Sequence, residues 1–176
     1  MKKVIIIGSC GAGKSTLAKR LSKQTGIKLV HLDQKYWKPN WERTDRIVFR
    51  KKVKKLIRGG KWIIDGNYRD TMDIRIKAAD TIIFLDFSRW ICLFRIFKRR
   101  VKSNRVDNLV CCEEQVTYEL IKWIIWTFPR INRKEILSRI NKVKDKKRIV
   151  ILKSNRQVED FLSNTREARG LLSKYI

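Results

Sequence analysis

Residues 8–15 have the spacing of a loop that binds phosphate groups. They read GSCGAGKS and fit the pattern G-x-x-x-x-G-K-[ST] at every fixed position. Glycine permits the tight turns that bring main-chain N–H groups close to an anion. We expect Lys14 to reach the β- and γ-phosphates of a nucleotide, and the Ser15 hydroxyl to ligate Mg²⁺. The predicted nucleotide contacts are Gly8, Gly11, Ala12, Gly13, Lys14, Ser15 and Thr16.

Two aspartates compete for a place in the Mg²⁺ shell. Asp65 follows the apolar run at 62–64, and Asp86 follows the run at 81–85. A carboxylate at the end of a strand beside the phosphate-binding loop can hold the water shell of the metal. The pattern of the runs alone does not choose between the two, although Asp86 with Ser88 is also typical of a turn that leads into a helix.

Side chains between residues 31 and 46 indicate where a phosphoryl acceptor binds. The Asp33 carboxylate can orient an alcohol or accept its proton, whereas a phosphate acceptor requires arginine. Both kinds of group occur, so both acceptor classes stay open at this point. The candidate acceptor residues are Asp33, Trp37, Arg43, Arg69 and Arg75. The alternatives are that Asp33 caps a helix and that the aromatic residues cover the core.

Short apolar runs alternate with helical patterns along the chain. The runs predict strands at 4–7, 28–31, 62–64, 81–85 and 148–152. Apolar spacing predicts helices at 14–24, 45–57, 89–101, 113–128, 132–143 and 157–162, with Pro129 interrupting the path. Strands that alternate with helices predict an α/β fold with a parallel sheet covered on both faces. No repeat or linker divides the chain, so we expect one domain over 1–176.

The charge balance is strongly basic. Forty-three Lys and Arg residues against 17 Asp and Glu give a net charge of +26. Such a surface attracts phosphates, nucleic acid and anionic membranes, or is simply a solvated lysine-rich surface. Four cysteines without CxxC spacing and one histidine argue against a zinc site or a disulfide framework. No stretch is long enough to span a bilayer, so we expect a cytoplasmic protein without a membrane partner.

Three segments resemble adenylate kinases and related nucleoside monophosphate kinases. WIIDGNYR at 62–69 resembles their D-G-F-P-R segment, although Asn67 and Tyr68 stand in place of Phe and Pro. RIFKRR at 95–100 resembles the start of their lid, and KSNR at 153–156 follows the last strand like their adenine loop. The resemblance implies that Asp65 serves the metal, that Arg69 or Arg75 binds acceptor phosphate, and that the nucleotide also meets Arg95, Arg99, Lys153 and Asn155. Asp33 occupies a position that resembles the hydroxyl-binding Asp of shikimate- and gluconate-type kinases.

The whole chain resembles the bacterial DNA topology modulation protein group, which are adenylate-kinase-like P-loop proteins. The likeness rests on GSCGAGKST, HLDQKYW, WERT, WIIDGNY, DTIIFLDFSRW, FKRR, WTFPR and ILKSNRQVEDFL. It implies a three-layer P-loop NTPase fold with five parallel strands in the order 2-3-1-4-5 and a mobile lid at about 101–130.

The implied function is ATP- and Mg²⁺-dependent transfer of the γ-phosphoryl group to a nucleotide or other small acceptor. The catalytic set would be Lys14, Asp33, Asp65, Arg95 and Arg99. The alternative is a nucleic-acid-binding protein that ATP switches and that modulates DNA topology, using basic clusters at 50–55, 95–105 and 142–148. The acceptor, the preference for ATP over GTP and the oligomeric state stay open.

Overall fold

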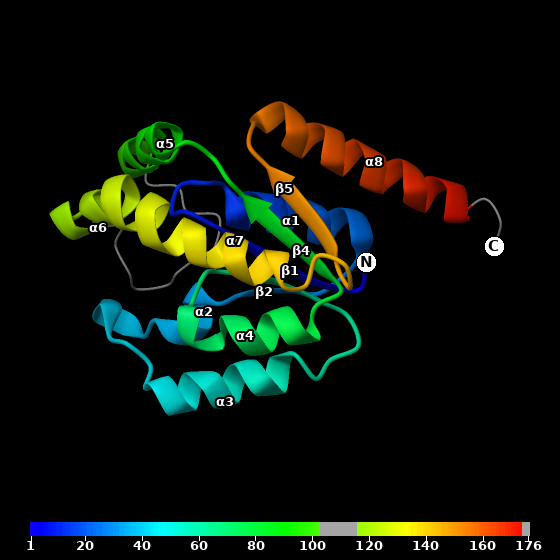
Figure 1. The fold of residues 1–176 in the computed structure, drawn as a ribbon, viewed down its shortest axis with the longest axis horizontal. Helices are drawn as coiled ribbons and strands as arrows, with labels where there is room; N and C mark the ends of the chain where they lie inside the picture. Colours follow the sequence, from blue (N-terminus) through cyan, green and yellow to red (C-terminus); the bar gives the residue numbers. More distant parts are fainter. Residues whose placement is uncertain (103–115, 174–176) are drawn as a thin grey trace.

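Five parallel strands form one sheet in the computed structural model, which describes residues 1–102 and 116–173 (Figure 1). The strands are β1 (Lys3–Gly8), β2 (Leu29–His31), β3 (Trp62–Asp65), β4 (Thr81–Leu85) and β5 (Arg148–Leu152). Their order is β2-β3-β1-β4-β5, with every neighbouring pair parallel, which confirms the predicted topology. The central strand β1 therefore ends between the carboxyl ends of β3 and β4, where Ile6 lies opposite Asp65 and Gly8 opposite Leu85.

Helices cover both faces of the sheet, because successive side chains of each strand point to opposite faces. Val4 and Ile6 belong to the core under α1 (Lys14–Thr25), α5 (Arg89–Lys102) and α8 (Asn155–Ser173). Ile5 and Ile7 belong to the core under α3 (Arg46–Leu56), α4 (Arg69–Ala78) and α7 (Arg133–Asn141). The predicted three-layer P-loop NTPase fold is confirmed. The shorter elements are α2 (Asp33–Tyr36), η1 (Pro39–Trp41), α6 (Tyr118–Lys122) and η2 (Trp123–Asn132).

Helix α4 was not among the predicted helices. Its buried face consists of Thr71, Met72, Arg75 and Ile76, so a charged residue occupies a core position. A buried arginine breaks the apolar periodicity by which an amphipathic helix is detected. The sequence pattern therefore does not predict this helix, and its buried face is understood only from the contacts of the Arg75 side chain.

The prediction that Pro129 interrupts the chain path was wrong. Helical structure runs without a break from Tyr118 through η2 into α7, and η2 is a π-helix that contains Pro129. In an α-helix the proline ring clashes with the carbonyl four residues earlier. The wider π turn removes that clash, so the helix continues.

The predicted lid at about 101–130 lies partly outside the described residues, which leave out 103–115. In the described part, Ile124 and Phe128 of η2 are buried in the two cores. Residues 123–130 therefore belong to the packed body of the fold. Among the described helices, none is long and apolar enough to cross a membrane.

Candidate active site

The phosphate-binding loop (residues 8–15) connects β1 to α1 and needs glycine at two positions. Gly11 and Gly13 have φ angles of +75° and +93°, which L side chains rarely adopt. A Cβ at Gly11 would also lie 2.2 Å from the carbonyl oxygen of Cys92. Gly13 is the N-cap of α1 and has no side chain to cap it, so the first N–H groups of α1 face the loop. The loop and the helix N-terminus thus form a concave anion site.

Lys14 already lies over this loop. Its Nζ donates a hydrogen bond of 2.9 Å to the carbonyl oxygen of Ser9. The ammonium group is therefore held within the concave site, and a bound phosphate would compete with the Ser9 carbonyl for it.

Asn67 clamps the start of the phosphate-binding loop. Its Nδ2 donates to the Gly8 carbonyl oxygen at 2.7 Å, and the Gly8 N–H donates to its Oδ1 at 3.0 Å. A side-chain amide carries one acceptor and two donors, so it can copy the pairing of a peptide group. Asn67 thereby extends the contact between β1 and β3 by one further pair of hydrogen bonds. Sequence reasoning treated Asn67 only as a departure from a family pattern and missed this contact.

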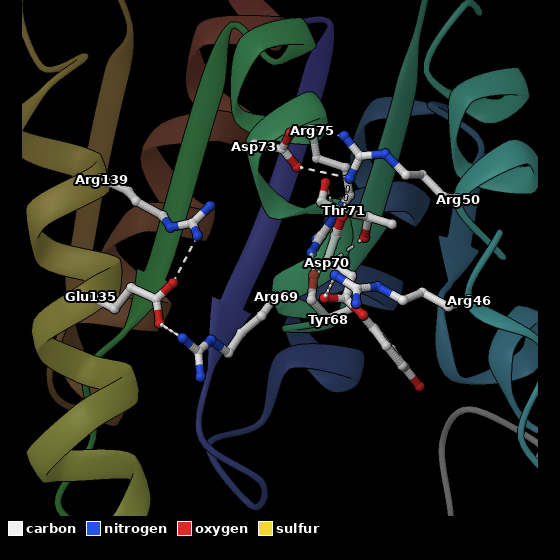
Figure 2. Close-up of polar contacts among 10 residues, drawn as sticks. All are labelled: Arg46, Arg50, Tyr68, Arg69, Asp70, Thr71, Asp73, Arg75, Glu135 and Arg139. Carbon is white, nitrogen blue, oxygen red and sulfur yellow. Dashed lines mark hydrogen bonds and ion pairs between the residues drawn. The ribbon is translucent and has the colours of Figure 1, made fainter.

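Arg75 stabilises the segment that connects β3 to α4. Its side chain is fully buried, and its guanidinium donates to the carbonyl oxygens of Tyr68 (3.0 Å) and Thr71 (Figure 2). It also donates to the carbonyl oxygens of Gly66 (2.8 Å) and Asn67. Burial lowers the pKa of Arg75 to about 10, so the group still carries its charge at neutral pH. The expectation that Arg75 binds an acceptor phosphate is corrected, because its donors are used within residues 66–71.

Arg69 also lies away from the acceptor side. Its guanidinium forms an ion pair of 2.8 Å with Glu135 of α7, which Arg139 contacts as well (Figure 2). Arg69 is the first residue of α4, and its side chain runs toward α7. The carboxylate of Glu135 therefore holds the arginine that sequence reasoning assigned to an acceptor phosphate.

Asp65 stands at the sheet edge with His31 as its partner. The two residues lie opposite each other on β3 and β2, and His31 Nδ1 is 2.8 Å from Asp65 Oδ1. Asp65 is only 4% exposed, so this hydrogen bond fixes the orientation of a buried carboxylate. The sequence pattern did not indicate the bond between His31 and Asp65.

Asp65 and Ser15 suit a metal that binds mainly to water and phosphate. No group of three or more His, Cys, Asp or Glu residues that could hold a metal occurs among residues 1–102 and 116–173. Mg²⁺ in nucleotide sites needs only one or two protein oxygens and keeps waters and phosphate oxygens as its other ligands. The two oxygen-bearing side chains therefore fit Mg²⁺ better than a metal that needs a protein cage.

Asp86, the competing carboxylate, is held by an arginine. Arg133 donates to both oxygens of Asp86 at 2.7 and 2.8 Å, and these bonds raise the pKa of Arg133 above its ordinary value. The pair lines a cavity of about 340 Å³ together with Ser9 and Lys153. Lys153 is thus on this side of the loop, and its main-chain N–H donates to Gln157.

Arg95 connects α5 to the phosphate-binding loop. It donates to the carbonyl oxygen of Ala12 at 3.1 Å and to Asn155 Oδ1 at 2.5 Å, and it lies 4.6 Å above the ring of Phe87. These residues line a cavity of about 240 Å³ that also includes Gly13 and Thr16. The structure therefore brings together Arg95, Asn155 and the loop, as the resemblance implied, but places Lys153 in the neighbouring cavity.

The largest of these cavities, of about 610 Å³, lies on the other side of Lys14. Asp33 lines it, and Asp33 Oδ1 accepts a hydrogen bond of 2.6 Å from the Tyr68 hydroxyl. Burial and the adjacent Asp33 charge raise the pKa of Tyr68, so the phenol stays protonated and donates. The other side chains that line the cavity include Trp37, Trp41, Arg43, Arg99 and Trp123.

The walls of this cavity are largely aromatic. Trp37 and Trp41 meet edge to face with ring centroids 5.3 Å apart, and Arg43 lies 5.9 Å above the Trp37 ring. Trp37 and Arg43 also form an antiparallel bridge, which fixes this short segment. The structure thus brings Asp33, Trp37, Arg43 and Arg99 together with Lys14 around one cavity, without Arg69 and Arg75.

Solved kinase structures share this fold. A shikimate kinase from Aquifex aeolicus aligns with a TM-score of 0.50 and 16% identity over 96% of this chain and 98% of that one. A gluconokinase from Sinorhizobium meliloti gives 0.53 and 13% over 98% and 97%. A deoxyadenosine kinase from M. mycoides with bound dATP gives 0.53 and 16% over 93% and 98%.

At these identities the likeness shows the fold alone. It supports the adenylate-kinase-like P-loop architecture and does not show the DNA topology modulation group. No family model and no curated protein matches the chain.

We expect Arg75→Met to lower the free energy of unfolding by about 3 kcal/mol or more, because it leaves several buried carbonyl oxygens without a donor. Urea unfolding followed by tryptophan fluorescence measures this loss. Arg69→Met is the matched control: it removes a partly exposed ion pair and should cost less than about 1 kcal/mol. Equal losses in the two variants would contradict the structural role of Arg75.

Proposed function

We propose that the chain is an ATP-dependent kinase that transfers the γ-phosphoryl group to a hydroxyl of a small acceptor. The observation that carries this proposal is the cavity in which Lys14 and Asp33 meet. One side chain suits the phosphates of the donor, and the other suits the hydroxyl of an acceptor. We also propose that residues 1–176 form a single domain, since all five strands belong to one sheet.

The cavity around Arg95 and Asn155 suits the base of ATP. It adjoins Gly13 and Thr16, so a nucleotide whose phosphates lie in the loop can extend into it. A guanidinium can stack on a flat ring and also donate to phosphate. Ser15 and Asp65 would hold Mg²⁺, which supplies charge neutralisation at the β- and γ-phosphates.

An alcohol acceptor fits the large cavity better than a phosphate acceptor does. Arg69 is paired with Glu135 and Arg75 is used within its own loop, so the two arginines that the resemblance assigned to an acceptor phosphate lie elsewhere. Arg43 does line the cavity, where it lies over the Trp37 ring. Asp33 lines the large cavity, and the hydrogen bond from the Tyr68 hydroxyl orients its carboxylate. The tryptophan walls favour an acceptor with a flat or apolar body, such as a nucleoside or another ring-bearing alcohol.

The proposed phosphoryl transfer depends on the positions of Asp33, Lys14 and Arg99 around the large cavity. Asp33 orients the acceptor hydroxyl and takes its proton as the hydroxyl oxygen bonds to the γ-phosphorus of ATP, and the bond to ADP breaks. Lys14 and Arg99, which line the same cavity, neutralise charge on the phosphoryl group in transit. Catalysis is then positioning and electrostatic stabilisation, without a covalent enzyme intermediate.

The alternative, an ATP-switched nucleic-acid-binding protein, has no specific observation in its favour. Its basic clusters would have to share one face, yet α3 and α5 pack on opposite faces of the sheet. Arg50 of α3 is paired with Asp73, and Arg95 of α5 contacts the phosphate-binding loop. Arg95 of α5 lines the cavity beside Gly13, and Arg99 lines the cavity shared by Lys14 and Asp33, as the kinase proposal requires.

Replacing Lys14 by Ala should abolish acceptor-dependent ADP release, because it removes the ammonium group held over the loop. Lys19→Ala, on the exposed side of the same helix, is the matched control and should keep normal turnover. Calorimetry with ATP supplies the second readout. Unchanged ATP affinity and turnover in Lys14→Ala would contradict the assignment of the phosphate site.

Asp65→Asn should reduce turnover by roughly a hundredfold or more, because the carboxylate charge beside the metal is lost. Asp86→Asn should keep turnover within a few-fold and instead lower the free energy of unfolding by about 1 kcal/mol, since it weakens a partly buried contact with Arg133. Steady-state kinetics and urea unfolding of both variants separate the two roles. The reverse result would show that Asp86 serves the metal.

Asp33→Asn should lower turnover about 10²- to 10⁴-fold while leaving ATP affinity unchanged, because only the acceptor proton loses its base. ADP release screened over nucleosides, nucleoside monophosphates, sugars and hydroxy acids should favour ring-bearing alcohols. If nucleoside monophosphates are the better acceptors and Asp33→Asn keeps turnover, the acceptor assignment fails, while the ATP site stands.

A further inference from the structure

Helix α5 exposes a continuous row of large apolar side chains. Trp90, Phe94, Phe97 and Val101 are 61%, 66%, 45% and 86% exposed, and they define the α5 stripe. Their spacing of four, three and four residues places them on one face of the helix. Single exposed apolar residues are ordinary on protein surfaces, but a contiguous patch indicates an interaction site.

The α5 stripe is not the face by which the helix packs on its own fold. Cys92 and Ile96 are fully buried in the core, and Arg95 contacts the phosphate-binding loop from the same inner side. Helix α5 lies at the periphery of the molecule beside η2 (Figure 1). It therefore carries two apolar faces, of which the fold uses one.

Basic residues flank the α5 stripe on both sides. At about 100° per residue, Arg89 and Arg100 lie roughly 90–110° to one side of its centre, and Lys98 lies roughly 70° to the other. All three side chains are exposed. An aromatic face bordered by Lys and Arg is the pattern of a helix that lies in the plane of a membrane surface.

We propose that the α5 stripe docks the protein on the surface of an anionic lipid bilayer. The aromatic rings would enter the boundary between headgroups and acyl chains, and the flanking cations would contact acidic headgroups. The net charge of +26 complements an anionic surface. This mode of binding needs no spanning segment, so the expectation of no membrane partner, which rested on spanning length alone, does not bear on it.

A second copy of the chain is a poorer occupant. The three aromatic side chains expose roughly 300–400 Å² between them, at about 150–250 Å² for a whole aromatic side chain. Each partner in a stable protein interface buries about 800 Å². Two chains of +26 also repel each other, whereas a membrane with acidic lipids attracts both the stripe and its flanking charges.

Docking through the α5 stripe leaves the nucleotide cavity in place. Arg95 and Arg99 lie on the inner side of α5, and their contacts with the two cavities do not involve the stripe. Changes to the stripe should therefore alter lipid binding and leave turnover in solution unchanged. This separates the membrane proposal from the proposed kinase function, because either one can fail without the other.

Co-sedimentation of the full chain with vesicles tests the proposal. Vesicles of phosphatidylcholine with phosphatidylserine should bind the protein at least about tenfold more strongly than phosphatidylcholine alone, and added salt should weaken the binding. The double variant Phe94→Ser/Phe97→Ser should lose at least about tenfold of the binding. Its matched control is Ile47→Ser/Val48→Ser, which removes two exposed apolar side chains from α3 and should bind normally.

A second pair of variants tests the flanking charges. Lys98→Gln/Arg100→Gln should lower binding about tenfold or more, whereas Lys54→Gln/Lys55→Gln on α3 should lower it much less. Brominated lipid should quench wild-type tryptophan fluorescence more than that of Trp90→Phe. All of the substituted side chains are exposed, so unchanged thermal unfolding confirms that the variants fold.

Four outcomes would overturn the proposal. The wild type might fail to bind acidic vesicles, or the α3 and α5 charge pairs might lose binding equally, which would indicate net charge alone. Sedimentation velocity without lipid could show a dimer that the Phe94→Ser/Phe97→Ser variant lacks, which would make the stripe a contact between copies. Binding of duplex DNA that is lost in the same variant, without lipid binding, would assign the stripe to nucleic acid.

Discussion

The two hydrogen bonds between Asn67 and Gly8 join the halves of the candidate active site. On one side of this contact lies the loop that suits phosphate, and on the other lies the connection from β3 to α4 that carries Tyr68. Tyr68 in turn holds Asp33. Asn67, bound on both its polar atoms, therefore links the glycine-rich loop to the segment that holds the Asp33 carboxylate.

Buried charge stabilises this arrangement instead of apolar packing alone. Arg75 occupies a core position on α4 and donates to the carbonyl oxygens of Gly66, Asn67 and Tyr68, of which the last also accepts the main-chain N–H of Thr71. Removing a buried guanidinium lowers the free energy of unfolding more than replacing the whole polar cluster by apolar residues would, because its partners remain buried without a donor. Hydrogen bonds from Arg75 to main-chain carbonyl oxygens therefore hold the turn at residues 66–68 in place beside the parallel sheet.

The cations of this chain divide by what they contact. Arg75 and Arg133 are bound within the fold, and Arg95 and Arg99 face the two cavities beside the phosphate-binding loop. Arg89, Lys98 and Arg100 are exposed around the α5 stripe, and Arg89 also donates to the carbonyl oxygen of Ile125. One helix thus presents arginine to the two cavities on its inner side and aromatic residues to the exterior. A net charge alone cannot distinguish these uses, because it sums groups that lie in very different environments.

The pattern of residues determined the phosphate-binding loop and the sheet, because both depend on local chemistry. Gly11 and Gly13 permit a backbone that other residues resist, and continuous apolar runs are typical of strands buried on both faces. The positions of the strands were therefore predictable, whereas their order in the sheet was expected only from the resemblance to adenylate-kinase-like proteins. The roles of Asp65, Asp33 and Arg95 stay predictions; the sequence placed Asp65 and Asp33 after strands, and the resemblance to adenylate kinases singled out Arg95.

Only the tertiary structure decided which charged side chains are available to a ligand. Arg69 and Arg75 look equivalent to Arg43 and Arg99 in the sequence, but Glu135 and the carbonyl oxygens of residues 66–71 bind the first two. The roles of Asn67 and His31 were equally hidden, because their partners lie 59 and 34 residues away. A side chain's chemistry is set by its residue type, whereas its partner is set by contacts between distant segments that no local pattern encodes.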